Sequence, residues 1–395
     1  MSGAEPTPVT HSENLRKAFP AVIGALVCVH ASMAATRVTA SLLLLHTGFP
    51  EWTVGALLSL FAVAPIGLAL WAGRLADRHG MHRPLGVGVA MGALGAAAAV
   101  VSQHPVALAV AALATGGAIS VAAVGIQREA GLMAREPSDL KRVFSWVSLG
   151  PAVSNAGAPV IVGLLIDHIG FRAGFVFAAV LPLMAWGFGR AVPRSPLPAS
   201  EPSVAMARPG AWGLLRSASF RRLLLVNLAL SSCWDAHSFA VPVLGHARGL
   251  SASSIGVVLG SFAVAATVVR LAISRWADHL DERRALRRAM ALATATCAIY
   301  LWLPGTAGMV AGSALLGLAL GSVQPMILSM LHQVTPADRH GQALGLRMVA
   351  TNAATIVMPL GFGLLAALTV PAAPLWLMAL LVLLAQWPAS RIRRP

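Results

Sequence analysis

Stretches of about 20 mostly apolar residues recur along the whole chain, and they constrain the fold more than any other feature. A helix of about 20 such residues crosses the ~30 Å hydrocarbon core of a bilayer, and lipid accepts only helices or closed barrels. Hydrophobic residues make up 57% of the sequence, more than in a soluble domain. We therefore predict an all-α membrane protein with twelve spans, at 20–44, 53–72, 84–103, 105–127, 143–166, 173–191, 221–244, 253–273, 289–304, 306–331, 343–366 and 373–388.

The charge distribution indicates a topology and argues against a nucleic-acid partner. The net charge is +15, but the basic residues gather in alternate loops and at both ends of the chain. The other loops hold only Arg172 and Arg248, which by the positive-inside rule puts both termini in the cytoplasm. Cys28, Cys233 and Cys297 all lie inside predicted spans, so no disulfide framework or metal site is expected. No cleavable signal peptide is expected either.

The chain repeats itself at an offset of 201 residues. "TVGALLSLFAVAPIGLALWAGRLAD" (53–77) aligns without gaps on "SIGVVLGSFAVAATVVRLAISRWAD" (254–278), and Asp77 meets Asp278. We predict two pseudo-symmetric six-helix bundles at 20–191 and 221–388. A cytoplasmic linker at 192–220 joins them, and tails at 1–19 and 389–395 flank them.

The loop after the second predicted span carries a Gly, three residues, an Asp, a basic residue and a second Gly. Its residues are Gly73, Asp77, Arg78, Gly80 and Arg83. With the two six-helix repeats, this spacing resembles the major facilitator superfamily over the whole chain. Met81 and His82 depart from the family pattern, in which basic residues are more common. A weaker second copy keeps Asp278, Arg283 and Arg284 but has Ser274 and Asp281 in place of the glycines.

The loop predicts a conformational latch. An Asp at the membrane interface accepts charge-assisted hydrogen bonds from a neighbouring helix, and a Gly lets that helix approach closely. A contact made in one conformation and broken in the other biases a two-state equilibrium. The resemblance implies that this loop stabilises the outward-facing state.

The fifth predicted span is rich in glycine and proline. "LGPAVSNAGAPVIVGLLID" contains Gly150, Pro151, Gly157, Pro159 and Gly163, whereas Ala158 replaces a Gly of the family pattern. Small residues permit tight helix contact, and a proline removes a backbone donor. The resemblance to the antiporter motif of the family indicates export.

Polar side chains deep in the spans are the candidate site. Asp235 is an acid well inside a span, with Trp234 beside it and His237 two residues on. Arg37 is similarly deep in the first span, and His30 lies two turns earlier. The offset of 201 places Asp235 opposite Ala34, within one turn of Arg37. Because the family resemblance implies that both helices line a central cavity, we predict that Arg37 and Asp235 face each other.

Other polar residues are weaker cavity candidates. They are Gln324, Arg347 and Asn352. Arg270, near the inner end of its span, is expected to extend to the interface. The fourth span lacks the mid-helix arginine that the family often uses in proton coupling, so Asp235 is the expected proton carrier.

These features predict a secondary transporter, with no enzymatic activity and no cofactor. We expect proton-coupled export of a small organic molecule by alternating access across a bacterial inner membrane, by a monomer. The alternative is proton-coupled import of an organic anion, which Arg37 and Arg347 would favour. A membrane enzyme or sensor is disfavoured, because the sequence has no phosphate-binding loop and no paired metal-ligand spacing.

Overall fold

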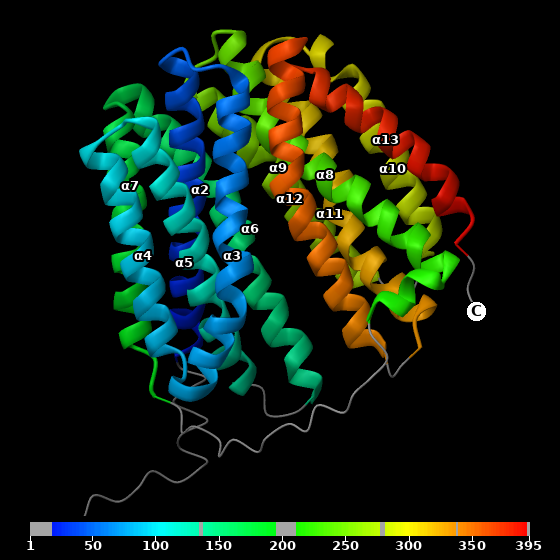
Figure 1. Cartoon of the computed structure of the whole chain (residues 1–395), viewed down its shortest axis with the longest axis horizontal. Coiled ribbons are helices and arrows are strands. Elements are labelled where there is room, and N and C mark those ends of the chain that lie inside the picture. The colour runs from blue at the N-terminus through cyan, green and yellow to red at the C-terminus, as the bar shows by residue number, and fades with distance from the viewer. Residues whose placement is uncertain (1–17, 134–136, 195–210, 277–280, 337–338, 393–395) are drawn as a thin grey trace, which may run out of the picture. The chain divides into compact units, whose positions relative to one another are not determined.

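A computed structural model of the chain describes residues 18–133, 137–194, 211–276, 281–336 and 339–392, which are almost entirely helical (Figure 1). The first half of the sequence forms α2 (Phe19–His46), α3 (Glu51–His79), α4 (His82–Val101), α5 (Pro105–Leu132), α6 (Pro137–His168) and α7 (Phe171–Arg190). The second half forms η1 (Ala211–Arg216), α8 (Ala218–Ala247), α9 (Ala252–Trp276), α10 (Glu282–Ile299), η3 (Tyr300–Trp302), α11 (Gly305–Val334), α12 (His340–Leu368) and α13 (Ala373–Ser390). The predicted all-helical fold is confirmed.

Within the described ranges, 10 helices are long and apolar enough to cross a membrane. The multi-pass membrane class is thereby confirmed, and the number of twelve spans stays a prediction. The two long helices outside this group, α8 and α10, are the more polar ones. α8 carries Asn227, Asp235 and His237 in its middle, and α10 begins with charged residues. The predicted span 289–304 is helical only to Ile299, because the chain then turns through η3 toward Pro304.

The described contacts divide the chain into two compact units. The first contains residues 1–40 and 60–200, and the second contains 41–59 and 201–395. This division departs from the predicted bundle boundaries at 41–59, where the start of α3 packs against α12. A methyl group at Gly55 would overlap the carbonyl of Pro359, and Ser59 Oγ donates to the carbonyl of Ile356.

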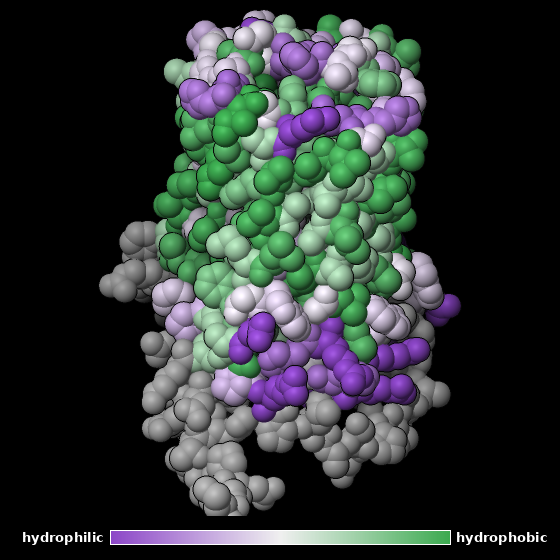
Figure 2. Space-filling view, turned by 90° about the vertical axis from the view of Figure 1, so that its left-hand side faces the viewer, coloured by the Kyte–Doolittle hydropathy of each residue, from purple (hydrophilic) through white to green (hydrophobic). Residues whose placement is uncertain are grey.

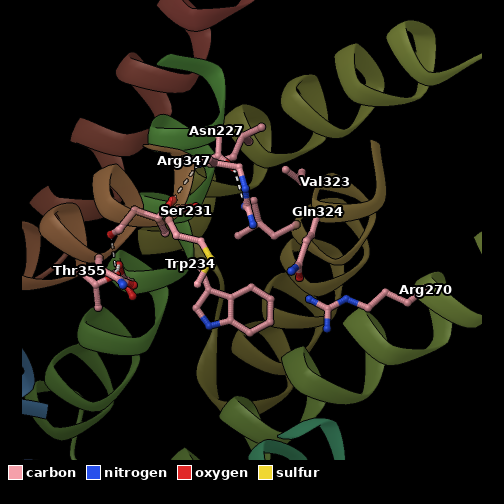
Figure 3. Close-up of a pocket in the computed structure, with 14 residues that line it drawn as sticks. Asn227, Ser231, Trp234, Arg270, Val323, Gln324, Arg347 and Thr355 are labelled. Carbon is pink, nitrogen blue, oxygen red and sulfur yellow. Dashed lines mark hydrogen bonds between the residues drawn. The ribbon is translucent and has the colours of Figure 1, made fainter. Parts of the chain in front are cut away.

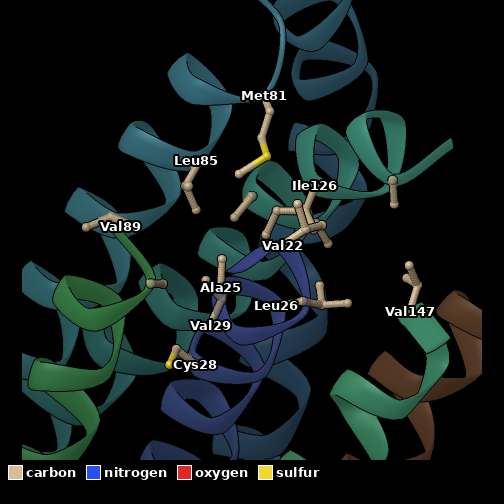
Figure 4. Close-up of a cluster of buried hydrophobic side chains, with 14 of the residues drawn as sticks. Val22, Ala25, Leu26, Cys28, Val29, Met81, Leu85, Val89, Ile126 and Val147 are labelled. Carbon is tan, nitrogen blue, oxygen red and sulfur yellow. The ribbon is translucent and has the colours of Figure 1, made fainter. Parts of the chain in front are cut away.

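The core of the first unit is a cluster of buried aliphatic side chains from α2, α4, α5 and α6 (Figure 4). Val22, Leu26, Leu85 and Ile126 are fully buried in it. Large apolar residues on the outer surface are abundant as well, among them Leu94 on α4 and Leu183 on α7. Figure 2 shows a broad hydrophobic belt between two polar ends, as expected for a lipid-facing surface.

Small residues allow helices to cross at close range in both units, and the same crossing recurs 201 residues later. On α5, a Cβ at Gly116 would overlap the backbone carbonyl of Phe61 on α3. On α11, a Cβ at Gly317 would overlap the carbonyl of Phe262 on α9. Membrane helices without side chains at a crossing gain van der Waals contact between their backbones. These two glycines therefore set how closely α3 meets α5 and α9 meets α11.

A second pair of contacts follows the same offset. In the first unit, Gly150 of α6 lies against Leu26 of α2, where a Cβ would come within 2.9 Å of Leu26 Cδ2. In the second unit, Asn227 of α8 donates a hydrogen bond of 3.0 Å to Thr351 of α12. Corresponding helices thus meet at corresponding residues, but the contact is apolar in the first unit and polar in the second.

Candidate functional site

The second unit contains a cavity of about 420 Å³ formed by α8, α9, α11 and α12. Figure 3 shows that side chains from these helices point into one space, with Trp234 at one side and Arg270 and Gln324 at another. The charged residues in its wall are Asp235, Arg270 and Arg347. The volume lies at the lower end of the range for small-molecule pockets.

Helical periodicity explains how α8 and α12 present polar groups to this cavity. Residues four apart lie on one face of a helix, and Asn227, Ser231 and Asp235 follow that spacing on α8. Arg347, Thr351 and Thr355 follow it on α12 and line the same cavity.

Hydrogen bonds join the two polar stripes. Arg347 Nη1 donates to Asn227 Oδ1 at 3.3 Å, and the Asn227 amide donates to Thr351. One turn further along, Thr355 donates to Asp235 Oδ2 at 3.2 Å. Asp235 is only 8% exposed, so its carboxylate lies in the wall of the cavity within a largely buried environment.

Arg270 lines the cavity and does not simply reach for the interface. Its Nε donates to the carbonyl of Gly321 on α11 at 3.3 Å. Its guanidinium carbon lies 5.7 Å from the centroid of the Trp234 ring, within the range of a cation–π contact. The glycine at 321 contributes because a Cβ there would come within 2.6 Å of the Ala266 backbone, so α9 and α11 cross closely beside Arg270.

The structure thus brings together five of the candidates read from the sequence, and it adds others. The five are Trp234, Asp235, Gln324, Arg347 and Asn352. Sequence reasoning missed Asn227, Ser231, Arg270, Thr351 and Thr355. The four-residue polar spacing on α8 and α12 was a signal that could have found four of these five, all but Arg270.

His237 lies behind the cavity and does not line it. Its ring stacks on Phe262 with centroids 4.2 Å apart, and the other neighbour of Phe262 is Trp234, edge-on at 4.5 Å. His237 Nε2 lies 2.8 Å from Ser313 Oγ, which in turn lies 2.7 Å from the hydroxyl of Tyr300. The imidazole is therefore part of a buried polar chain that supports the aromatic wall.

The two candidates on α2 belong to the first unit. His30 Nδ1 lies 3.1 Å from the carbonyl of Leu26 within the same helix. Arg37 also lies on α2, whereas Asp235 belongs to the second unit. The predicted pairing of Arg37 with Asp235 stays a prediction.

The latch loop joins α3 to α4 with a tight turn. Gly80 has φ of +68°, a left-handed conformation that glycine adopts without strain. Asp77 Oδ1 lies 3.8 Å from Arg128 Nε of α5, and the Asp77 side chain is 77% exposed. A Cβ at Gly73 would meet no heavy atom of the described residues within 4 Å, so the close helix approach expected there is not seen. Arg78 ends α3, and Arg83 is exposed at the start of α4.

Part of the second copy of the loop, including Asp278, lies outside the described residues. The next acid, Asp281, caps α10 by accepting from the backbone N–H groups of Arg283 and Arg284, both at 3.0 Å. Arg284 Nε also lies 3.6 Å from Asp281. An exposed aspartate thus begins this helix where the first copy has a turn glycine.

The Gly- and Pro-rich segment lies within α6, which contains Pro151 and Pro159. Besides the contact of Gly150 with Leu26, Ser154 Oγ donates to the carbonyl of Val27 on α2 at 2.8 Å. A Cβ at Gly157 would meet none of the described heavy atoms within 4 Å. Gly163 is in the same helix. The first part of the segment therefore packs tightly on α2.

Two cysteines meet beside the cavity, and no metal-binding cluster is found among the residues described. Cys233 Sγ lies 3.5 Å from Cys297 Sγ, and both thiols are buried and free. His, Cys, Asp and Glu side chains in the described ranges form no group of three that could hold a metal ion.

Comparison with known proteins gives a consistent result. A family model described as Major Facilitator Superfamily matches residues 22–312 and 223–394. The crystal structure of the nucleoside transporter NupG is similar with a TM-score of 0.81 at 13% identity, covering 96% of this chain and 100% of that one. A transporter of the POT family in complex with 5-aminolevulinic acid has a TM-score of 0.76 at 10% identity, covering 94% and 95%. A bacterial homologue of the iron transporter ferroportin has a TM-score of 0.71 at 16% identity, covering 98% and 99%.

Proposed function

Because this chain belongs to the Major Facilitator Superfamily and is a membrane transporter of that type, we propose that it is a secondary active transporter that exports a small organic molecule in exchange for protons. The observation that carries the proposal is the cavity of the second unit, which places a largely buried carboxylate, Asp235, among hydrogen-bonding side chains. The proposed location is a bacterial inner membrane. We propose a monomer of twelve spans with both termini in the cytoplasm.

Asp235 is the proposed proton carrier. An acid inside the membrane is costly and normally serves a pathway or a partner. The bond from Thr355 holds the carboxylate in the wall of the cavity, where a proton and a substrate can reach the same group. Binding of one can then depend on the presence of the other, which is the requirement for coupling.

Arg37 is the proposed charge partner of Asp235. A double-mutant cycle tests the pair, with thermal stability as the readout. If the pairing is right, Arg37→Ala is less stable than the wild type, and Arg37→Ala combined with Asp235→Asn regains part of the loss. Equal stability of the single and double variants would contradict the pairing.

Alternating access requires helices that can change their contacts. The proposed latch is Asp77 with Arg128, and its second copy includes Asp278. The contact of Gly55 with Pro359 is a further candidate, because it joins the start of α3 to α12 through backbone alone.

Export is the proposed direction, supported by the glycine and proline residues of α6. The test uses right-side-out and inverted membrane vesicles with an imposed pH gradient and a panel of labelled organic compounds. Export predicts proton-driven uptake into inverted vesicles only. Uptake into right-side-out vesicles would support the import alternative, and no proton-driven movement in either orientation would contradict the proposed transport.

A further inference from the structure

The cavity in the second unit carries more positive than negative charge. Its wall contains two guanidinium groups, Arg270 and Arg347, and one carboxylate, Asp235. In the part of the chain that the structure describes, neither guanidinium has a carboxylate oxygen within 4.0 Å. Buried cations are normally paired, because removing a charge from water is costly. A negatively charged ligand would therefore meet two cations that the described protein groups do not neutralise.

Arg347 has donor capacity to spare. Its Nη1 donates to the neutral amide of Asn227, and its Nε is buried without a hydrogen-bond partner among the described residues. A buried donor without an acceptor carries a free-energy cost. An oxygen atom of a ligand that accepts from this nitrogen removes the cost. Guanidinium donors form a planar fork that matches a carboxylate or a phosphate.

Arg270 adds a flat surface to the second cation. Its contacts with Gly321 and with the Trp234 ring hold the guanidinium beside the indole. Figure 3 shows Arg270, Gln324 and Trp234 directed toward the same space. Trp234 is itself backed by Phe262, so the indole is a supported wall. A flat unsaturated ring can stack there while its charged group reaches a guanidinium.

We infer that the molecule bound in this cavity is a small organic oxyanion, a carboxylate or a phosphate carried on a flat ring, held by Arg270 and Arg347 and stacked on Trp234. The inference deepens the proposed transport function by naming the substrate class, and it rests on that function. The binding site itself can be tested without any transport measurement.

The test measures the thermal stability of the purified full chain in detergent against matched probes. Benzoate, benzamide and benzamidine share one ring and differ in charge, being anionic, neutral and cationic. Phenyl phosphate separates a phosphate from a carboxylate preference. A ligand that binds the folded state raises its melting temperature with concentration. We expect benzoate or phenyl phosphate to stabilise the protein, and the neutral and cationic probes to have no effect at equal concentration.

Variants locate the binding. Arg270→Gln and Arg347→Gln should each weaken anion binding roughly tenfold or more, because each removes a charge-assisted hydrogen bond. Arg172→Gln removes the same charge from the exposed start of α7 and should bind as the wild type does. Stabilisation by benzamidine or benzamide in place of the anions would overturn the inference. So would anion binding that survives both arginine variants.

The outcome is separable from that of the proposed function. If vesicles accumulate neutral or cationic compounds in a proton-driven way while anions neither bind nor move, transport stands and the oxyanion class is wrong. If anions bind through Arg270 and Arg347 but nothing moves with the pH gradient, the binding site stands and the transport proposal fails.

Discussion

The hydroxyl of Thr355 on α12 donates a hydrogen bond to the carboxylate of Asp235 on α8 at 3.2 Å. The same hydroxyl lies 3.2 Å from the carbonyl of Thr351 one turn earlier, so the carboxylate and a backbone carbonyl compete for one donor. A carboxylate with this neighbour keeps its hydrogen bond when it is charged. When it is protonated, it becomes a donor itself, and the hydroxyl is released to the helix backbone.

Replacing Asp235 by Asn should abolish proton-driven transport and leave substrate binding in place. The amide is nearly the same size as the carboxylic acid but carries no titrating proton. A pH-jump assay in proteoliposomes measures the driven flux, and the thermal shift with a bound ligand measures binding. Glu51→Gln neutralises an acid at the start of α3 as a control and should transport normally. Undiminished driven flux in Asp235→Asn would remove this residue as the proton carrier.

Replacing Asp77 by Asn, or Arg128 by Gln, should stop most transport without destabilising the protein. The pair is separated by 3.8 Å and Asp77 is largely exposed, so its contribution to folding stability is about 1 kcal/mol or less. Its proposed effect is on the balance between conformations. The measurements are turnover per correctly folded molecule and the melting temperature. Arg74→Gln, an exposed charge one turn before Asp77, is the matched control. Normal turnover in Asp77→Asn would contradict the latch.

Replacing Gly317 by Ala should destabilise the protein, whereas the same change at Gly157 should not. A methyl group at 317 would overlap the Phe262 carbonyl and lie 2.9 Å from Ala265 Cβ, so α9 and α11 must move apart. Overpacking of this kind costs about 1–3 kcal/mol. At Gly157 the methyl group meets no described atom within 4 Å, and alanine is the better helix former. Melting temperatures of both variants, with Gly116→Ala as the counterpart of Gly317→Ala, decide the point.

Replacing His237 by Gln should weaken transport without abolishing it. The imidazole lies behind the aromatic wall and bonds to Ser313, so its loss loosens Trp234 and leaves the cavity groups in place. Tyr300→Phe removes the far end of the same chain and should lower stability by about 1–3 kcal/mol. Flux and melting temperature measured on both variants separate the two effects. Complete loss of flux in a well-folded His237→Gln protein would instead make His237 part of the coupling machinery.

The helical membrane fold could be predicted because long apolar segments leave a chain few alternatives. Helix ends were less predictable. α3 continues to His79 and α5 to Leu132, beyond the predicted spans, because helices extend past the hydrocarbon core into polar residues. The short ninth span was misread where the chain turns at η3, since its apolar residues look the same in a turn and in a helix.

The candidate site could be predicted only in part, because a cavity depends on which helix faces meet. Asp235 was recognised from its depth in an apolar span, and Arg347 and Gln324 in the same way. Arg270 was misjudged, since its position near a helix end is typical of side chains that extend to the interface. Its contact with Gly321 arises from the close crossing of α9 and α11, which no local pattern in α9 reveals.

The two corresponding crossings, Leu26 with Gly150 and Asn227 with Thr351, indicate a division of labour within a duplicated chain. After duplication, backbone contacts such as those of Gly116 and Gly317 restrict both copies equally, since neither position accepts a side chain. Positions beside them are under no such restriction. The second copy has polar groups at its crossing, whereas the first has an aliphatic one. Divergence of this protein's substrate preference can therefore proceed through α8 and α12 while the inherited scaffold of both copies stays unchanged.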